Sequence, residues 1–259
     1  MITLLKLGGS VITDKSKPYT ARMADIKRLA REVKEALDKD KSLRLIIGNG
    51  GGSYPHQPAK RGDLASGIKD AWQLEHLVET HRAAAELNHM IVTELVKAGV
   101  PAIAVKPSSA AYTNNREIAS FNIMMIEELL KLKAVPVIHG DVLLDLKQGC
   151  SIVSTEKLFR YIAGLLPVGR AVIGTNVDGV LDDKNRVIEK ITNSNFSEVK
   201  KHLKGAATTD VTGGMLHKVE SMLEMSKVVP EIRIVNALKK GNIAAALEGK
   251  PIGTLITNG

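Results

Sequence analysis

Two glycine-rich segments, each following an apolar run, carry residues whose types and spacing favour chemistry. Residues 6–10 read Lys-Leu-Gly-Gly-Ser, and residues 50–56 read Gly-Gly-Gly-Ser-Tyr-Pro-His. Glycine lets the backbone approach a ligand closely, and successive free N–H groups in such a turn bind anions. Lys6 and His56 add one basic side chain to each loop. A lone Gly-Gly pair is commonly only a tight turn, but two such loops with basic neighbours predict a site for two phosphate groups.

Two further lysines lie where they can reach the same anions. Lys15 follows the first loop, and Lys218 lies one turn into a predicted helix that opens at Thr212 and two glycines. The start of that helix offers free N–H groups and the positive end of the helix dipole, with Asp210 and Thr212 as candidate caps. An exposed lysine is by default only solvated. Because each lysine stands beside a glycine pair, we expect them to converge on one cluster of phosphate oxygens.

The elements that must position these loops alternate between strands and helices. Apolar strand runs are predicted at 3–7, 43–47, 101–105, 135–139, 170–174, 231–235 and 254–257. Amphipathic helices are predicted at 24–37, 72–98, 121–132, 156–166, 195–203 and 213–228, with a last helix ending at Leu247. A hairpin is expected over 141–153 and an irregular loop over 60–69. Such alternation predicts a mainly parallel sheet covered on both faces, with ligands bound beyond the carboxyl ends of its strands. Both glycine loops follow such ends.

Composition indicates a soluble globular protein. The chain has 259 residues, of which 44% are hydrophobic and 25% charged, enough for one large domain or two closely associated domains. Its single cysteine, Cys150, excludes an internal disulfide and a cysteine metal cluster, and fits a reducing cytoplasm. We see no signal peptide and no apolar run of membrane-spanning length, so we expect a cytoplasmic protein without a membrane partner.

Nucleic-acid binding is one explanation for the net charge of +8. The lysines and arginines are dispersed beside acidic residues, however, and aromatic residues make up only 3% of the chain, too few for a stacking platform. A protein that handles small polyanions fits this charge as well as a nucleic-acid-binding protein does. We therefore expect no nucleic-acid partner.

The known phosphate-binding motifs are missing: there is no GxxxxGK[ST] loop, no GxGxxG fingerprint, and none of the HRD or DFG elements of protein kinases. Six segments instead resemble the amino acid kinase superfamily, in the expected order and over nearly the whole chain. They are residues 5–10 with 14–15, 50–56, 136–141, 175–181, 210–215 with Lys218, and 253–254. His56 after the glycine loop and the Ile-His-Gly-Asp run at 138–141 narrow the resemblance to the isopentenyl phosphate kinase and fosfomycin kinase branch.

This resemblance implies a fold and an activity. The fold would be a three-layer αβα sandwich with a mainly parallel central sheet, forming a single domain over residues 1–259. Residues 1–167 would bind the phosphate acceptor and mediate dimerisation, and residues 168–259 would bind the nucleotide. The activity would be transfer of a phosphoryl group from ATP, with Mg²⁺, to isopentenyl phosphate. The resemblance also implies a homodimer, formed through helices of the amino-terminal half.

The resemblance assigns roles to individual residues. The nucleotide would contact Lys6, Gly8, Gly9, Ser10, Gly52, Thr175, Asp178, Gly179, Gly214 and Lys218. The acceptor would contact Gly51, His56, His81, Gly140 and Thr155. The catalytic set would be Lys6, Lys15, His56, Glu156 and Lys218. An acceptor phosphate is already ionised at neutral pH, so no general base is required. No protein metal ligand is assigned, because phosphates and water would hold Mg²⁺.

Several positions depart from the family pattern, including Tyr54-Pro55 where the family often has Phe-Gly and Lys157 where it tends to have Asp. Asn49 stands where the family usually has His, and Thr155-Glu156 stand where it tends to have Gly-Asp. We expect Glu156 to orient the catalytic lysines with a longer arm, and Thr155 to narrow the room beside the acceptor. The helix at 72–98 is expected to line a pocket for the acceptor tail, and His76 within it is interpreted as a surface residue.

Two alternative functions stay open at this point. One is a kinase for another small phosphate or phosphonate, similar to fosfomycin kinase. The other is a nucleotide-binding sensor without catalytic activity, against which the retained lysines and His56 argue.

Overall fold

The computed structural model describes residues 1–205 and 211–259, and the side chains outside 204–213. Its main sheet contains β1 (Ile2–Leu7), β2 (Arg44–Asn49), β3 (Ala102–Ala104), β6 (Val135–His139), β9 (Val168–Thr175), β10 (Lys190–Ile191), β11 (Glu231–Asn236) and β12 (Thr254–Ile256). A smaller sheet contains β4 (Ala111–Asn114), β5 (Glu117–Phe121), β7 (Asp141–Asp145) and β8 (Gly149–Val153). The helices are α1 (Gly9–Ile12), α2 (Met23–Lys39), α3 (His56–Arg61), α4 (Ala71–Lys97), α5 (Met124–Lys131), α6 (Thr155–Ala163), α7 (Phe196–Gly205), α8 (Val211–Met225) and α9 (Asn242–Leu247), with 3₁₀ helices η1 (Leu64–Ser66) and η2 (Pro107–Ser109).

The register of the main sheet brings the two glycine loops together. Its strand order is β10-β12-β11-β9-β1-β2-β6-β3, and β1 pairs in parallel with both β2 and β9. Leu7 at the end of β1 is therefore level with Asn49 on β2 and Gly174 on β9. Because parallel strands end at the same edge, the loops that follow these three strands meet there.

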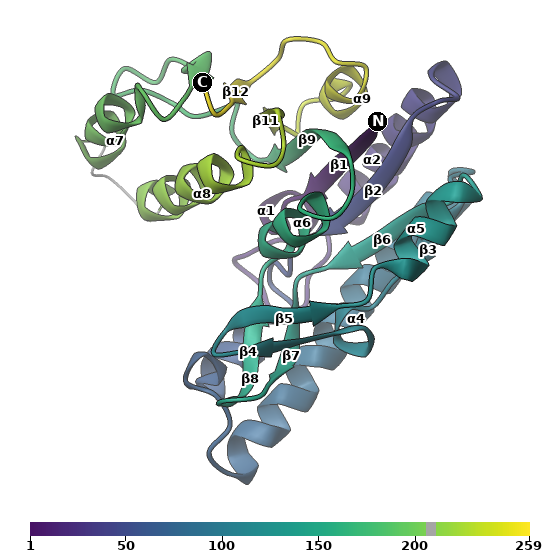
Figure 1. The fold of residues 1–259 in the computed structure, drawn as a ribbon, viewed down its shortest axis with the longest axis vertical. Coiled ribbons are helices and arrows are strands. Elements are labelled where there is room, and N and C mark those ends of the chain that lie inside the picture. Colours follow the sequence, from purple (N-terminus) through teal and green to yellow (C-terminus); the bar gives the residue numbers. More distant parts are fainter. Residues whose placement is uncertain (206–210) are drawn as a thin grey trace.

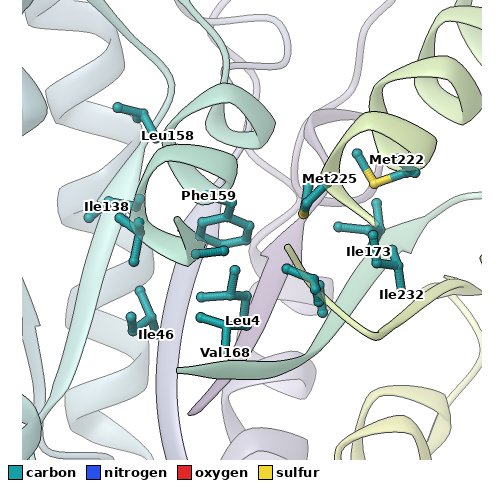
Figure 2. Close-up of a cluster of buried hydrophobic side chains, with 14 of the residues drawn as sticks. Leu4, Ile46, Ile138, Leu158, Phe159, Val168, Ile173, Met222, Met225 and Ile232 are labelled. Atoms are coloured by element: carbon teal, nitrogen blue, oxygen red, sulfur yellow. The ribbon is translucent and has the colours of Figure 1, made fainter. Parts of the chain in front are cut away.

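Alternating residues of the strands build two apolar layers. Leu4, Ile46 and Ile138 face α5, α6 and α8, where Phe159 is fully buried (Figure 2). Their chain neighbours Leu5 and Ile47 face the opposite layer, formed by α2, α4 and α9. Figure 1 shows helices on both sides of the sheet. The predicted three-layer αβα sandwich with a mainly parallel sheet is thus confirmed.

The smaller sheet packs beside α4 and closes one end of the molecule (Figure 1). A separate apolar cluster of Ala59, Leu64, Val142 and Cys150 fills the space between α3, η1 and this sheet. The Cys150 thiol is buried there, and burial raises its pKa to about 11.

Several predictions of local structure were wrong. The hairpin of β4 and β5 was not predicted, because its turn uses Asn115 and Arg116 at positive φ instead of glycine. Helix α5 begins at Met124, since the residues up to Phe121 complete β5. The predicted loop at 60–69 contains the end of α3 and all of η1. His76 is buried, and its Nδ1 lies 3.0 Å from the carbonyl oxygen of Trp72.

The candidate cap Asp210 lies outside the described residues, as does the side chain of Thr212. No helix within the described ranges has the 18-residue apolar stretch that crossing a bilayer needs.

Candidate active site

A cavity opens at the edge where β1, β2 and β9 end. Its wall includes most of the predicted site residues, drawn from segments far apart in the sequence: Lys6, Gly8, Gly9, Ser10, Lys15, Gly51, Gly52, His56, Gly140, Thr155, Glu156, Thr175 and Lys218. The edge of the sheet, both glycine loops, and helices α6 and α8 therefore contribute to one site.

The two glycine loops pack against each other backbone to backbone. A Cβ atom on Gly9 would lie 2.5 Å from the Gly52 nitrogen, and one on Gly52 would lie 2.1 Å from Thr13 Oγ1. Gly52 also has a φ of +56°, which side chains disfavour. These positions require glycine because a side chain on either residue would separate the loops. Their close contact brings the backbone of both loops into the cavity wall.

A carboxylate in the cavity wall pairs with one lysine and lies near a second. Lys6 Nζ forms an ion pair with Glu156 Oε1, and each side chain is only 12% exposed. Burial alone raises the pKa of Glu156, but the charge and hydrogen bond of Lys6, with a smaller contribution from Lys218, hold this pKa below its ordinary value. Burial and Lys6 lower the pKa of Lys218, whereas Glu156 opposes that shift. The ionised carboxylate thus offsets two neighbouring ammonium groups.

His56 begins α3, directly after Pro55, and borders the same cavity. Its imidazole keeps part of its surface in solvent. Partial burial, followed by the charges of Lys15 and Lys6, lowers the pKa of His56. The imidazole is therefore largely neutral at pH 7 until an anion arrives, and an anion beside it would favour its charged form.

The wall near His56 has an apolar part. Ala59, Val142 and Ile152 line it together with Thr80 of α4. Thr155 is buried there, and its hydroxyl donates to the carbonyl oxygen of Asn49 over 2.7 Å. A ligand with a phosphate near His56 and a short hydrocarbon tail matches this combination.

Asn49 has a partner that the sequence reasoning missed. The side-chain amide of Asn88 on α4 donates to Asn49 Oδ1 over 2.8 Å, and both residues are buried. The amide of Asn49 in turn donates to the carbonyl oxygen of Gly50 over 3.3 Å. This chain of hydrogen bonds ties α4 to the second glycine loop.

Four predicted site residues lie outside the cavity wall. His81 Nδ1 lies 3.4 Å from Asp141 Oδ1, and this interaction raises the pKa of His81. Asp178 accepts from Asn236 and pairs with Lys239. Gly179 packs against Thr254, and Gly214 is exposed near the start of α8.

The cavity wall also contains residues that were not predicted, among them Thr80, Asp141 and Gly174. Gly174 could have been found, since it ends β9 at the same edge as the glycine loops. Among the described residues, no three His, Cys, Asp or Glu side chains gather as a metal site.

Comparison with known proteins agrees with this architecture. Residues 1–236 match the model of the amino acid kinase family, and the chain belongs to that family. Its relatives include the isopentenyl phosphate kinase of Methanocaldococcus jannaschii, 36% identical over 99% of this chain and 98% of that protein. The isopentenyl phosphate kinase of Methanothermobacter thermautotrophicus is 32% identical over 98% of both chains.

Solved structures give the same grouping. A crystal structure of isopentenyl phosphate kinase superposes with a TM-score of 0.83 at 28% identity, covering 99% of this chain and all of that one. A substrate complex of isopentenyl phosphate kinase gives a TM-score of 0.77 at 26% identity, covering 98% of this chain and all of that one.

Proposed function

We propose that this chain is an ATP-dependent isopentenyl phosphate kinase, which converts isopentenyl phosphate to isopentenyl diphosphate. The observation that carries this proposal is the cavity itself. Lys6, Lys218 and Glu156 line one part of it, and His56 lies next to the apolar wall formed by residues such as Val142. Its full-length relatives carry the same activity in their names.

We assign the ATP phosphates to the first glycine loop, with contacts from Gly8, Gly9, Ser10, Gly52, Lys6 and Lys218. Gly51 and His56 hold the acceptor phosphate, and Lys15 stabilises charge on the group in transfer. Phosphoryl transfer through a loose transition state depends on positioning and positive charge, which these residues supply. The ionised acceptor attacks directly, without a general base.

The remaining assignments follow the two lobes. Thr175, Asp178, Gly179 and Gly214 belong to residues 168–259, which we assign to the nucleotide. His81, Gly140 and Thr155 belong to residues 1–167, which we assign to the acceptor. Residues 168–259 begin with β9, which starts at Val168 and continues the main sheet next to β1.

Mg²⁺ enters this site as the counterion of ATP. The two carboxylates in the cavity wall are already engaged: Glu156 pairs with Lys6, and the buried carboxylate of Asp141 accepts from the N–H groups of Val142 and Ser108. Phosphates and water would therefore supply the metal ligands, and the protein would contribute its lysines beside them.

The oligomeric state and location are also part of the proposal. We propose a cytoplasmic homodimer that associates through the amino-terminal lobe. Exposed apolar side chains on α4, Trp72, Leu74 and Val78, support an interface there. The single reduced, buried cysteine supports a reducing compartment. Light scattering of the purified protein measures the mass, and a monomer at micromolar concentration would contradict the dimer.

The decisive experiment is a coupled ADP-release assay. Isopentenyl, dimethylallyl and geranyl phosphates and fosfomycin are compared as acceptors, with ATP and Mg²⁺ saturating. We expect the highest kcat/KM with isopentenyl phosphate. A preference for fosfomycin would make the chain a phosphonate kinase, and ATP binding without ADP release from any acceptor would favour the sensor.

A further inference from the structure

The loop that carries Lys15 has little support at its tip. It leaves α1 and returns to α2, and its base is closed by a bridge between Thr13 and Ala21 and by the Asp14 N–H bonded to the Thr20 carbonyl over 2.9 Å. Near the tip, the carboxylate of Asp14 accepts from Ser16, a contact within the loop itself. Such contacts shape the loop but do not fix it to the rest of the site.

The Thr20 N–H donates to Ser53 Oγ over 3.3 Å, and Tyr19 adds further contacts to the rest of the site. Its φ of +49° is unusual for a bulky residue, and such strain persists only where the surroundings impose it. Its N–H donates to the Ser53 carbonyl over 3.3 Å, and its ring meets the buried ring of Tyr54 edge-on at 5.6 Å. Its hydroxyl donates to Glu79 Oε1 on α4 over 2.7 Å. The backbone conformation thus directs the side chain away from its own loop onto α4 and the His56 segment.

Glu79 connects Tyr19 to α3, the helix that begins with His56. Arg61 Nη2 lies 2.7 and 2.8 Å from the two carboxylate oxygens of Glu79, and Arg61 is the last residue of α3. His56 is the first residue of α3, and Thr80, next to Glu79, lines the cavity. The hydrogen bond from Tyr19 lowers the pKa of Glu79, so the carboxylate is charged at neutral pH. Burial and this carboxylate raise the pKa of Tyr19, so the phenol remains a donor.

We propose that Tyr19 is a positioning residue for phosphoryl transfer: through Glu79 and Arg61 it fixes the Lys15 loop to α3, and so sets Lys15 relative to His56. This inference rests on the proposed function for its kinetic consequences. We call Tyr19, Glu79 and Arg61 the clasp. The lowered pKa of His56, to which Lys15 contributes, agrees with the two side chains being held close together.

The first test is Tyr19→Phe, which removes one hydroxyl and keeps the ring contact with Tyr54. The exposed tyrosine of β4 supplies the matched control, Tyr112→Phe. We expect Tyr19→Phe to lower kcat with isopentenyl phosphate about tenfold, because a small misplacement of a charged group weakens its contact with the transition state. The KM for ATP and the unfolding midpoint should match those of the control.

A double-mutant cycle separates positioning from general stability. In a Lys15→Met background, Tyr19→Phe should change the residual kcat less than about twofold, because the group it positions is gone. An NMR titration of His56, assigned with His56→Gln, should show its pKa rising toward the ordinary value in Tyr19→Phe, as the Lys15 charge moves away. A purely structural role for Tyr19 predicts neither result.

Any of three results overturns the proposal. The kcat of Tyr19→Phe is unchanged, Tyr19→Phe lowers kcat equally in the wild-type and Lys15→Met proteins, or the pKa of His56 is the same in Tyr19→Phe as in wild type. If Tyr19→Phe does not fold, Glu79→Gln, which keeps the volume but releases Arg61, is expected to give the same pattern. A wild-type protein that releases no ADP from isopentenyl phosphate refutes the proposed function alone. The His56 titration then still decides whether the clasp exists.

Discussion

Lys6 and Glu156 form an ion pair in the wall of the cavity although 150 positions separate them in the chain. Lys6 lies near the end of β1, and Glu156 lies in the first turn of α6. Without the carboxylate, Lys6 and Lys218 would repel each other in a partly buried site. The pair therefore holds positive charge in place before ATP arrives, which is the preorganisation that electrostatic catalysis requires.

Replacing Glu156 tests this role directly. Glu156→Gln removes the charge that holds the lysines, and we expect kcat to fall about 100-fold, as for the loss of one preorganised electrostatic contact. Glu156→Asp keeps the charge on a shorter arm and should retain more activity than Glu156→Gln. Steady-state kinetics with isopentenyl phosphate measure both. A Gln variant that is as active as the Asp variant would contradict the role of the charge.

The lowered pKa of His56 predicts how acceptor binding depends on pH. The free imidazole is neutral above its lowered pKa. The acceptor phosphate that we propose beside it would favour the protonated form, so binding should take up a proton. The KM for the acceptor should therefore increase as the pH rises above the pKa of the free His56, while the KM for ATP does not change. His56→Gln, which donates without charge, should abolish this rise and lower kcat/KM about 100-fold. If the acceptor KM of His56→Gln still rises with pH, another group causes the pH dependence.

The Asn49–Asn88 hydrogen bond should couple the stability of the fold to acceptor binding. Asn88→Ala leaves the buried Asn49 carbonyl without its donor, which should cost about 1–3 kcal/mol in the free energy of unfolding. The KM for the acceptor should rise, because Asn49 also supports Gly50. Urea denaturation and kinetics measure the two effects, with the exposed neighbour variant His89→Ala as control. Adding Asn49→Ala should cost less than the sum of the single changes, and simple additivity would disprove the coupling.

Asp145 should contribute stability that is lost in acid. Burial alone raises its pKa, but the N–H groups of Arg116, Lys147 and Gln148 outweigh this effect and lower the pKa to about 2 from an ordinary 3.8. A lowered folded-state pKa stabilises the fold above the ordinary value, and this contribution disappears as the pH falls from 3.8 through about 2. Asp145→Asn should thus lose about 2 kcal/mol of unfolding free energy at pH 7.

Denaturation of wild type and Asp145→Asn at neutral and acid pH checks this expectation. The difference between the two proteins should shrink toward zero near the folded-state pKa of Asp145. Because Asp145 closes the turns of the smaller sheet and is not in the cavity wall, kcat should not change. A difference that is constant with pH would show that the carboxylate charge is not the cause.

Much of the fold followed from local patterns. Alternating strand and helix signals predicted the main sheet, and the glycine loops and lysines at strand ends predicted which residues gather at its edge. The β4–β5 hairpin did not follow, because Asn115 and Arg116 give no glycine signal for a turn with positive φ. Its strands are also short, of 4 and 5 residues, which leaves too few positions for a clear alternation.

The supporting residues of the site could not be predicted for a different reason. Asn88 bonds to a residue 39 positions away, and Tyr19 bonds to one 60 positions away. Their partners are set by where α4 lies in the folded protein, and a polar residue on a long helix has no local pattern that reveals such a partner. Sequence reasoning proposes the groups that bind phosphate, whereas the structure is needed to find the residues that position them.

Cys150 gives the protein a practical property. It is the chain's single cysteine, it is buried between α3, η1 and the smaller sheet, and its pKa is raised to about 11. The native thiol is thus poorly nucleophilic toward maleimide reagents at neutral pH. A cysteine engineered onto the loop of Lys15 can therefore be labelled selectively with a fluorophore or spin probe, without first replacing Cys150.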